Sequence, residues 1–234
     1  MELTVLALLT LTLASGPGYA GQKQSETVDR SYAFGGGGAL KLKNFSGDVR
    51  VTGTSGNQVV IHAVRTATRE RLDNIKLDIS VEGSTINIEA NKRNENWPNS
   101  DKAKNNNVVD TTFDIQVPAS TSLDLYAFSG SLIVKDMTAD IEAQTFSGNI
   151  DLNVSGASGV PDLKAETFSG DIRAQVPPVS NGRVTFNSFS GDLDSDLPLT
   201  LHSQSRRNVS GDLGNGGGSK LEFKTFSGDL KLVK

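Results

Sequence analysis

Apolar and polar residues alternate with a period of two along most of this chain, which is the pattern of strands with one buried face. The clearest case runs over residues 75–81 and returns over 85–90, with Glu82-Gly83-Ser84 between them, and it predicts a β-hairpin. Shorter alternating or apolar segments predict further strands at residues 39–44, 49–51, 59–64 and 112–118. Only residues 66–72 favour a helix, with Thr66 or Thr68 as its cap.

A second level of order appears from residue 123 onward, where two alternating segments flank a recurring tetrapeptide. The tetrapeptide is Phe-Ser-Gly-Asp or a close variant, and it occurs seven times, starting at residues 45, 128, 146, 168, 189, 209 and 226. We interpret these tetrapeptides as corners. The residues to which we assign a structural role in them are Phe45, Gly47, Asp48, Phe128, Gly130, Phe146, Gly148, Phe168, Gly170, Asp171, Phe189, Gly191, Asp192, Gly211, Asp212, Phe226, Gly228 and Asp229.

The apolar positions change parity across a corner. Before the corner at 146 the apolar-facing positions are odd (Ile141, Ala143), and after it they are even (Ile150, Leu152). A straight strand with such a slip would turn its apolar face to water, so the chain must bend there. Glycine permits the bend because it reaches positive φ without strain, and the following Asp or Asn can bond nearby backbone N–H groups.

The repeat length selects the architecture. From residue 128 the corners lie about 20 residues apart, which suits one solenoid coil of two strands, whereas a propeller blade needs about 40 residues. We therefore predict an all-β, single-chain β-solenoid of the β-helix or β-roll kind, with successive coils about 4.8 Å apart. The corner phenylalanines should then form an aromatic column, interrupted by Val209. Arg206 and Arg207 stand where apolar residues are expected, so we predict a local defect around 199–208.

Four segments follow from these patterns. Residues 1–20 contain an apolar run and end on the small residues Gly18 and Ala20, which predicts a signal peptide, although Glu2 occupies the usually basic start. We expect export to the periplasm, the cell surface or the extracellular space. Residues 21–38 are predicted to be flexible, residues 39–118 to form a strand-rich cap with a long loop at 91–107, and residues 119–234 to form the repeat solenoid.

The amino-acid composition and the net charge argue against several kinds of functional site and partner. The chain has 234 residues and no cysteine, so disulfides, thiol nucleophiles and thiolate metal sites are excluded. The formal net charge is −4 and no basic run occurs, which argues against a nucleic-acid partner.

The corner units carry a family resemblance. Val117-Pro118 followed by Ser122 to Gly130, and the unit from Ala165 to Ile172, resemble a bacterial exported family of β-strand repeats of unknown function, catalogued as candidate adhesins. The resemblance covers about residues 40–234. It implies a single-chain, β-helix-like solenoid with a strand-rich N-terminal part, and the family has no established catalytic residues to carry over.

Two acidic arrangements have alternative interpretations. The corner aspartates Asp48, Asp171, Asp192, Asp212 and Asp229 could form a row that binds calcium, but Ser131 and Asn149 interrupt it and the calcium β-roll signature is absent. We favour aspartates that satisfy their own turns. Carboxylates facing outward could serve a glycosidase, but they are mixed with Lys and Thr and favour a solvated face; they are Asp124, Asp140, Glu142, Asp151, Asp162, Glu166 and Glu222.

The remaining candidates are isolated. His62 and His202 are far apart in sequence and have no ligand cluster, and the corner serines lack a nucleophile motif. Trp97 lies in the predicted loop and is a possible contact residue. We thus expect no catalytic, metal or cofactor site. The leading hypothesis is a non-catalytic, exported scaffold or binding protein of the bacterial envelope with a glycan or envelope protein as partner. The alternatives are a carbohydrate-active solenoid enzyme and a protein that associates end to end.

Overall fold

The computed structural model describes residues 22–93, 108–156, 159–178, 180–205 and 207–234. The predicted signal peptide at 1–20, Trp97 and most of the predicted loop at 91–107 lie outside these residues. In the described part of the chain no helix is long and apolar enough to cross a membrane.

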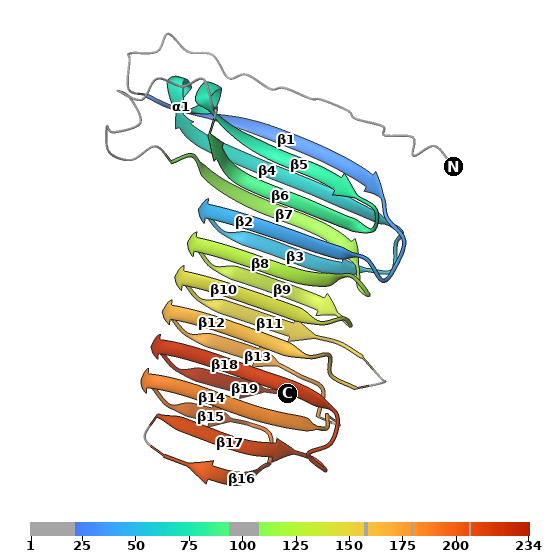
Figure 1. The fold of residues 1–234 in the computed structure, drawn as a ribbon, viewed down its shortest axis with the longest axis vertical. Helices are drawn as coiled ribbons and strands as arrows, with labels where there is room; N and C mark the ends of the chain where they lie inside the picture. Colours follow the sequence, from blue (N-terminus) through green and yellow to red (C-terminus); the bar gives the residue numbers. More distant parts are fainter. Residues whose placement is uncertain (1–21, 94–107, 157–158, 179, 206) are drawn as a thin grey trace.

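The fold consists of two long mixed β-sheets packed face to face, so the all-β prediction is confirmed (Figure 1). Sheet A contains, in spatial order, β1 (Lys23–Ala33), β4 (Gln58–Thr68), β7 (Asp110–Pro118), β3 (Val49–Thr54), β9 (Leu132–Met137), β11 (Ile150–Val154), β13 (Ile172–Gln175), β19 (Leu230–Val233) and β15 (Leu193–Ser195). Sheet B contains β16 (Leu199–Gln204), β17 (Asn208–Leu213), β14 (Gly182–Ser190), β18 (Ser219–Ser227), β12 (Leu163–Ser169), β10 (Ile141–Ser147), β8 (Ser122–Ser129), β2 (Ala39–Ser46), β6 (Thr85–Arg93) and β5 (Ile75–Glu82).

Six Phe-Ser-Gly corners join the two sheets. Each corner ends a strand of sheet B and starts a strand of sheet A, giving the coils β2–β3, β8–β9, β10–β11, β12–β13, β14–β15 and β18–β19. Neighbouring coils pair in parallel with corners in register, so that Ser147 lies between Ser129 and Ser169. This winding makes the chain solenoid-like, as the repeat length predicted.

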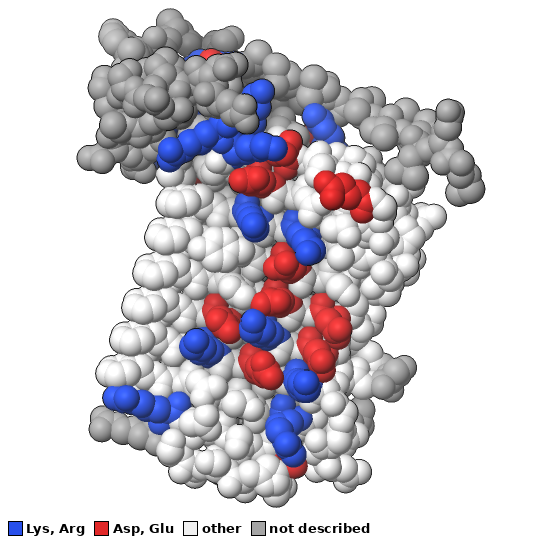
Figure 2. All heavy atoms as spheres, in the orientation of Figure 1, with Lys and Arg blue, Asp and Glu red and all other residues white. Residues whose placement is uncertain are grey.

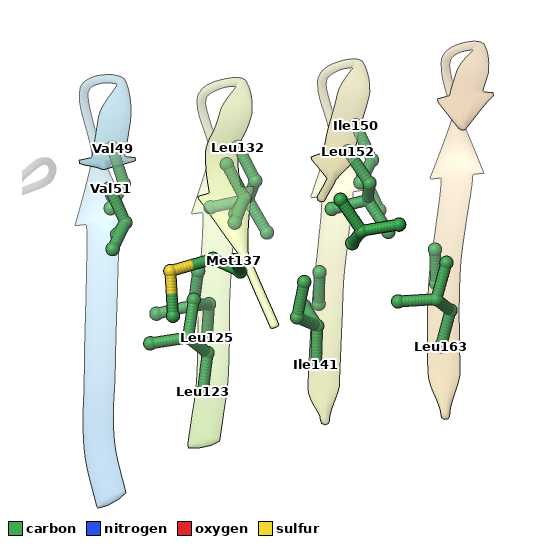
Figure 3. Packing of buried hydrophobic residues seen from close by; sticks show 14 of the residues in the cluster. Val49, Val51, Leu123, Leu125, Leu132, Met137, Ile141, Ile150, Leu152 and Leu163 are labelled. Carbon is green, nitrogen blue, oxygen red and sulfur yellow. The ribbon is translucent and has the colours of Figure 1, made fainter. Parts of the chain in front are cut away.

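Alternation places the core between the sheets. Leu123 and Leu125 of β8, Ile141 of β10 and Leu163 of β12 repeat the same inward positions from coil to coil, and all are buried (Figure 3). The core is one continuous cluster that runs through all the coils. Each coil is too thin to bury these side chains alone, so stacking stabilises the fold.

The order of the coils differs from the order in the sequence. The C-terminal coil β18–β19 lies between β12–β13 and β14–β15, because β18 pairs with both β12 and β14. After β15 the chain crosses to β16 and returns as β17, which pairs antiparallel with β14. Backbone hydrogen bonds to β14 and β16 hold β17 straight, so the predicted corner at Val209, Gly211 and Asp212 is wrong: these residues lie within β17. An irregularity predicted near residues 199–208 is present as a register shift between Leu201 and Ser203.

The N-terminal part confirms the hairpin and corrects two predictions. β5 and β6 pair antiparallel as expected, while the helix α1 spans Arg69–Asn74 and residues 66–68 belong to β4. Much of the segment predicted to be flexible forms β1, which pairs with β4 over its whole length. β1 is an edge strand that backbone hydrogen bonds to β4 stabilise. Its polar sequence therefore did not indicate a strand. The buried guanidinium of Arg65 in β4 pairs with Glu26 of β1 and donates to the backbone oxygen of Ile75.

Candidate functional site: the corner column

Glycine is required at each corner because the coils touch there backbone to backbone. A Cβ added to Gly148 would lie 2.2 Å from the oxygen of Gly130, and one added to Gly170 would lie 2.1 Å from the oxygen of Gly148. The corner glycines also have positive φ, for example +149° at Gly170. Both conditions exclude a side chain, so the corner can stack at strand spacing only with glycine.

The corner aspartates bond the neighbouring coil. Asp171 Oδ1 accepts the N–H of Asp229 at 2.9 Å, and Asp229 Oδ1 accepts the N–H of Asp192 at 2.8 Å. Asn149 plays the same part for the N–H of Asp171. We expected each aspartate to satisfy its own turn; instead the carboxylates of Asp48, Asp171 and Asp229 each link one coil to the next. An Asn serves equally, so the row needs acceptor oxygens and not charge.

A row of threonines lies on the inner side of the corners. Thr145 donates its hydroxyl to the oxygen of Gly130 at 3.1 Å, and Thr167 donates to the oxygen of Gly148 at 3.0 Å. Both threonines are buried. These bonds satisfy the corner carbonyls from inside the core, so the corners are rigid supports for the side chains outside.

The corner phenylalanines form one continuous stack on the outside of the protein. Neighbouring rings are nearly parallel, with interplanar angles of 2–18° and centroids 4.7–5.0 Å apart, in the order Phe45, Phe128, Phe146, Phe168, Phe226 and Phe189. The predicted column thus exists, and Val209 does not interrupt it. The rings lie on the surface and are 36–51% exposed. Because Thr145 points inward, alternation already turns Phe146 outward.

A second row of side chains runs beside the rings and was missed from the sequence. Tyr126, Gln144, Glu166, Lys224 and Asn187 lie two residues before the phenylalanines and share their face of sheet B. Together with the rings of Phe146, Phe168, Phe189 and Phe226 they line a groove of about 540 Å³. Figure 2 views the same side of the molecule, with a band of mixed charge along the middle of sheet B and uncharged surface toward the corners. Counting back by two from each corner would have found this row.

A guanidinium covers one end of the stack. Arg207, in the turn before β17, lies over the ring of Phe189 at 4.3 Å from its centroid. Such contacts between a cation and a ring face stabilise by about 0.5–2 kcal/mol. The arginine expected to mark a defect therefore serves as the cap of the aromatic column.

Five of the seven acidic candidates on the outer faces already have a hydrogen-bond or ion-pair partner. Lys164 donates to Glu142 at 2.8 Å and lies 3.7 Å from Glu166. Hydrogen bonding to Lys164 lowers the pKa of Glu142, and the same bond raises the pKa of Lys164. Asp151 pairs with Arg173 at 3.2 Å, and Asp140 accepts the N–H of Asp162. Asp124 and Glu222 lie in the same row as Glu142.

Each of the two histidines lies within hydrogen-bond distance of one carboxylate. His62 lies 2.6 Å from Asp29, and His202 Nε2 lies 2.6 Å from Asp212, which also accepts from Arg183 at 3.2 Å. The hydrogen bonds from His202 and Arg183 lower the pKa of Asp212. Across the described residues no group of three or more His, Asp or Glu side chains is placed to hold a metal ion.

Comparison with known proteins agrees with this architecture. The model of the family described as Toastrack DUF4097 matches residues 36–233. The chain belongs to this family. No curated protein matches it.

One of the similar solved structures shares the fold at low sequence identity. The crystal structure of a candidate cell adhesion protein from Clostridium sporogenes is 13% identical, with 88% of this chain and 98% of that chain covered and a TM-score of 0.60. A candidate adhesin from Bacteroides fragilis is 11% identical over 88% of this chain and 97% of that chain, with a TM-score of 0.34. The first likeness supports a common fold, and the second superposes too loosely to add to it.

Proposed function

We propose that this protein is a non-catalytic, exported scaffold of the bacterial cell envelope that binds a partner protein through its corner column. The observation that carries the proposal is the unbroken external stack of six phenylalanine rings. The five spacings of 4.7–5.0 Å make an apolar strip about 24 Å long. Exposed apolar strips of this length with a polar rim are typical of interaction surfaces.

The geometry of the rings favours a protein over a glycan. Sugars bind aromatic side chains by lying on an open ring face, but in this stack each inner ring has both faces against its neighbours. The edges of these inner rings meet solvent, and they form an apolar ridge that suits aliphatic side chains. Tyr126, Gln144, Asn187 and Lys224 beside the ridge offer hydrogen bonds to a partner backbone. This departs from the glycan that the sequence left open as a partner.

Three further observations support the wider proposal. Five of the seven candidate carboxylates on the outer faces are bound in ion pairs or backbone bonds, which suits a scaffold better than an acid–base pair. The Clostridium sporogenes protein with the same fold is itself a candidate cell adhesion protein. The apolar segment near residue 1 is the reason to expect export.

An adhesion assay tests the proposal. Beads coated with the protein are incubated with bacterial cells and with purified envelope proteins, and a glycan array is run in parallel. We expect the wild type to bind envelope protein and the variant Phe146→Thr/Phe168→Thr to lose at least tenfold in binding. The control Asp151→Ser/Arg173→Ser changes an equally exposed pair on the outer face of sheet A and should bind as the wild type does.

The outcomes separate the parts of the proposal. Equal binding by both variants would remove the column from the function, and no binding by the wild type would remove adhesion altogether. Glycan binding that survives the column variant would place a glycan site elsewhere. Release of sugars from envelope polysaccharide would contradict the non-catalytic assignment. Unfolding curves of both variants check that the fold is retained.

A further inference from the structure

The two sheets end at different levels at the C-terminal end of the stack. β14 and β15 are the two sides of one coil, and sheet A stops at β15, whereas sheet B continues with β17 and β16 (Figure 1). The inner side of β16 and β17 therefore faces no strand of sheet A in the described structure. A groove of about 780 Å³ lies there, and its apolar walls include Leu193, Leu199, Leu201 and Val209.

The backbone at this groove repeats a pattern that every inner corner satisfies. Gly228 N–H donates to Ser190 O at 3.1 Å, and Leu230 N–H donates to Asp192 O at 2.9 Å. In return Asp229 Oδ1 accepts the N–H of Asp192. Each inner coil thus gives two N–H groups to the next coil, and four of the five also give a side-chain oxygen, which belongs to Asp48, Asn149, Asp171 or Asp229.

The last coil has the same three groups and no described strand to receive them. β15 is the terminal strand of sheet A, so the N–H groups of Gly191 and Leu193 and the carboxylate of Asp192 face the groove. Nearby, the hydroxyl of Ser188 is buried and finds no hydrogen-bond partner in the described structure. The threonines at the equivalent positions of other coils all bond a corner carbonyl.

Charge adds a requirement on what binds there. On the outer face of sheet A one row reads Asp151, Arg173, Lys231 and Asp194 from coil to coil. Arg173 pairs with Asp151 at 3.2 Å and Lys231 approaches Asp194 at 4.0 Å. Opposite charges on neighbouring strands stabilise a sheet, so a basic residue fits next to Asp194 on the open side.

The number of strands argues against a second copy as the occupant. Among the residues that the structure describes, sheet A has nine strands and sheet B has ten. If copies stacked head to tail, both sheets would have to continue from one copy into the next with the same distance between copies. Because sheet A has one strand fewer than sheet B, a gap of one strand would then remain beside β15. A single strand added beside β15 gives sheet A ten strands, the same number as described in sheet B, and lies opposite β17.

We propose that the open edge of β15 binds an extended peptide segment of another protein, which runs parallel to β15 and becomes the tenth strand of sheet A. The backbone carbonyl oxygens of the peptide accept hydrogen bonds from the N–H groups of Gly191 and Leu193. One backbone N–H group of the peptide donates to the carboxylate of Asp192. Its side chains alternate between aliphatic residues that pack on Leu199 and Val209 and a Lys or Arg beside Asp194. Addition of a strand to a sheet edge is an established mode of peptide recognition. This site stands independently of the column, since it depends on backbone groups and not on the rings.

The probe is a fluorescent synthetic peptide, Phe-Ser-Gly-Asp-Leu-Lys-Leu-Val-Lys, which copies residues 226–234 and places a lysine next to Asp194. Binding to the full chain is measured by anisotropy, with a scrambled peptide of the same composition as control. We expect saturable binding of the ordered peptide and slower hydrogen exchange of the Leu193 amide in the complex.

Two variants locate the binding. Asp192→Ala removes one acceptor and should weaken binding about fivefold. Asp194→Lys should weaken it at least fivefold, and a peptide with Glu in place of its first lysine should bind this variant better than the wild type. The control Asp114→Lys makes the same change at an exposed position near the other end of sheet A and should leave binding unchanged.

Three results would overturn the proposal. They are equal binding of the ordered and scrambled peptides, binding that neither Asp192→Ala nor Asp194→Lys affects, and unchanged exchange of the Leu193 amide. A fourth result that would overturn it concerns sedimentation of the protein without peptide. A dimer of the wild type that Asp194→Lys dissociates would assign the edge to a second copy.

Discussion

The ring of Phe168 stacks on that of Phe226 at 4.7 Å, although Phe189 is much nearer to it in sequence. Phe189 instead lies on the far side of Phe226, at 4.8 Å. The C-terminal coil therefore sits inside the stack rather than at its end. Unfolding of the last residues would break contacts on two sides, so the C-terminal strand stabilises the coil before it and the coil after it.

The exposure of the column sets the cost of truncating one ring. Phe168 is 46% exposed and stacks on two neighbours, so Phe168→Ala should lower the free energy of unfolding by about 1–2 kcal/mol. Phe223 is 1% exposed, and Phe223→Ala should cost about 3–5 kcal/mol. Denaturant unfolding of both variants measures the difference. Equal costs would mean that the rings are buried after all.

Corner glycines should be intolerant even of alanine. Gly170→Ala would place its Cβ 2.1 Å from a backbone oxygen at positive φ, so we expect a loss of about 3 kcal/mol or more. Gly217 has open space around it, and Gly217→Ala should change stability by less than about 0.5 kcal/mol. Thermal unfolding of the pair measures this contrast. A mild effect at Gly170 would refute backbone contact between the coils.

The corner aspartates should be replaceable by asparagine. Asp171→Ala removes the acceptor for the Asp229 N–H and should cost about 1 kcal/mol. Asp171→Asn keeps an acceptor oxygen, as Asn149 does in the coil beside it, and should be nearly neutral. Unfolding free energies at neutral pH compare the two. A calcium site would give the opposite signature, with Asn as harmful as Ala and a stabilisation by added calcium.

Acid should remove the contribution of Asp212. Its pKa is lowered in the folded state by His202 and Arg183, so it binds a proton less readily there than in the unfolded chain. The stabilisation is therefore complete above the ordinary Asp pKa of about 3.9 and is lost as the pH falls through the lower folded value. The difference in unfolding free energy between the wild type and Asp212→Asn, measured from pH 5 to pH 2, should shrink with acid. A constant difference would contradict this assignment.

Much of the fold followed from local pattern. The hairpin of β5 and β6, the corners and the stacked coils were predictable because period-two alternation and glycine at a bend are local requirements of the backbone. The outward direction of Phe146 was also contained in the sequence, since its neighbour Thr145 belongs to the inward set. β1 was not predictable, because polar edge strands form only when a partner strand supplies hydrogen bonds.

The sequence by itself determined the repeated unit: a strand, a glycine corner, a second strand, and the side of the sheet on which each residue lies. Only the tertiary structure decided the order of the units and what their ends expose. All corners are nearly alike, so local pattern cannot distinguish which coil stacks on which. Antiparallel pairing of β17 with β14 settles that choice. As a result Val209 to Asp212 form part of a strand, and β15 has β19 as its one neighbour among the described strands.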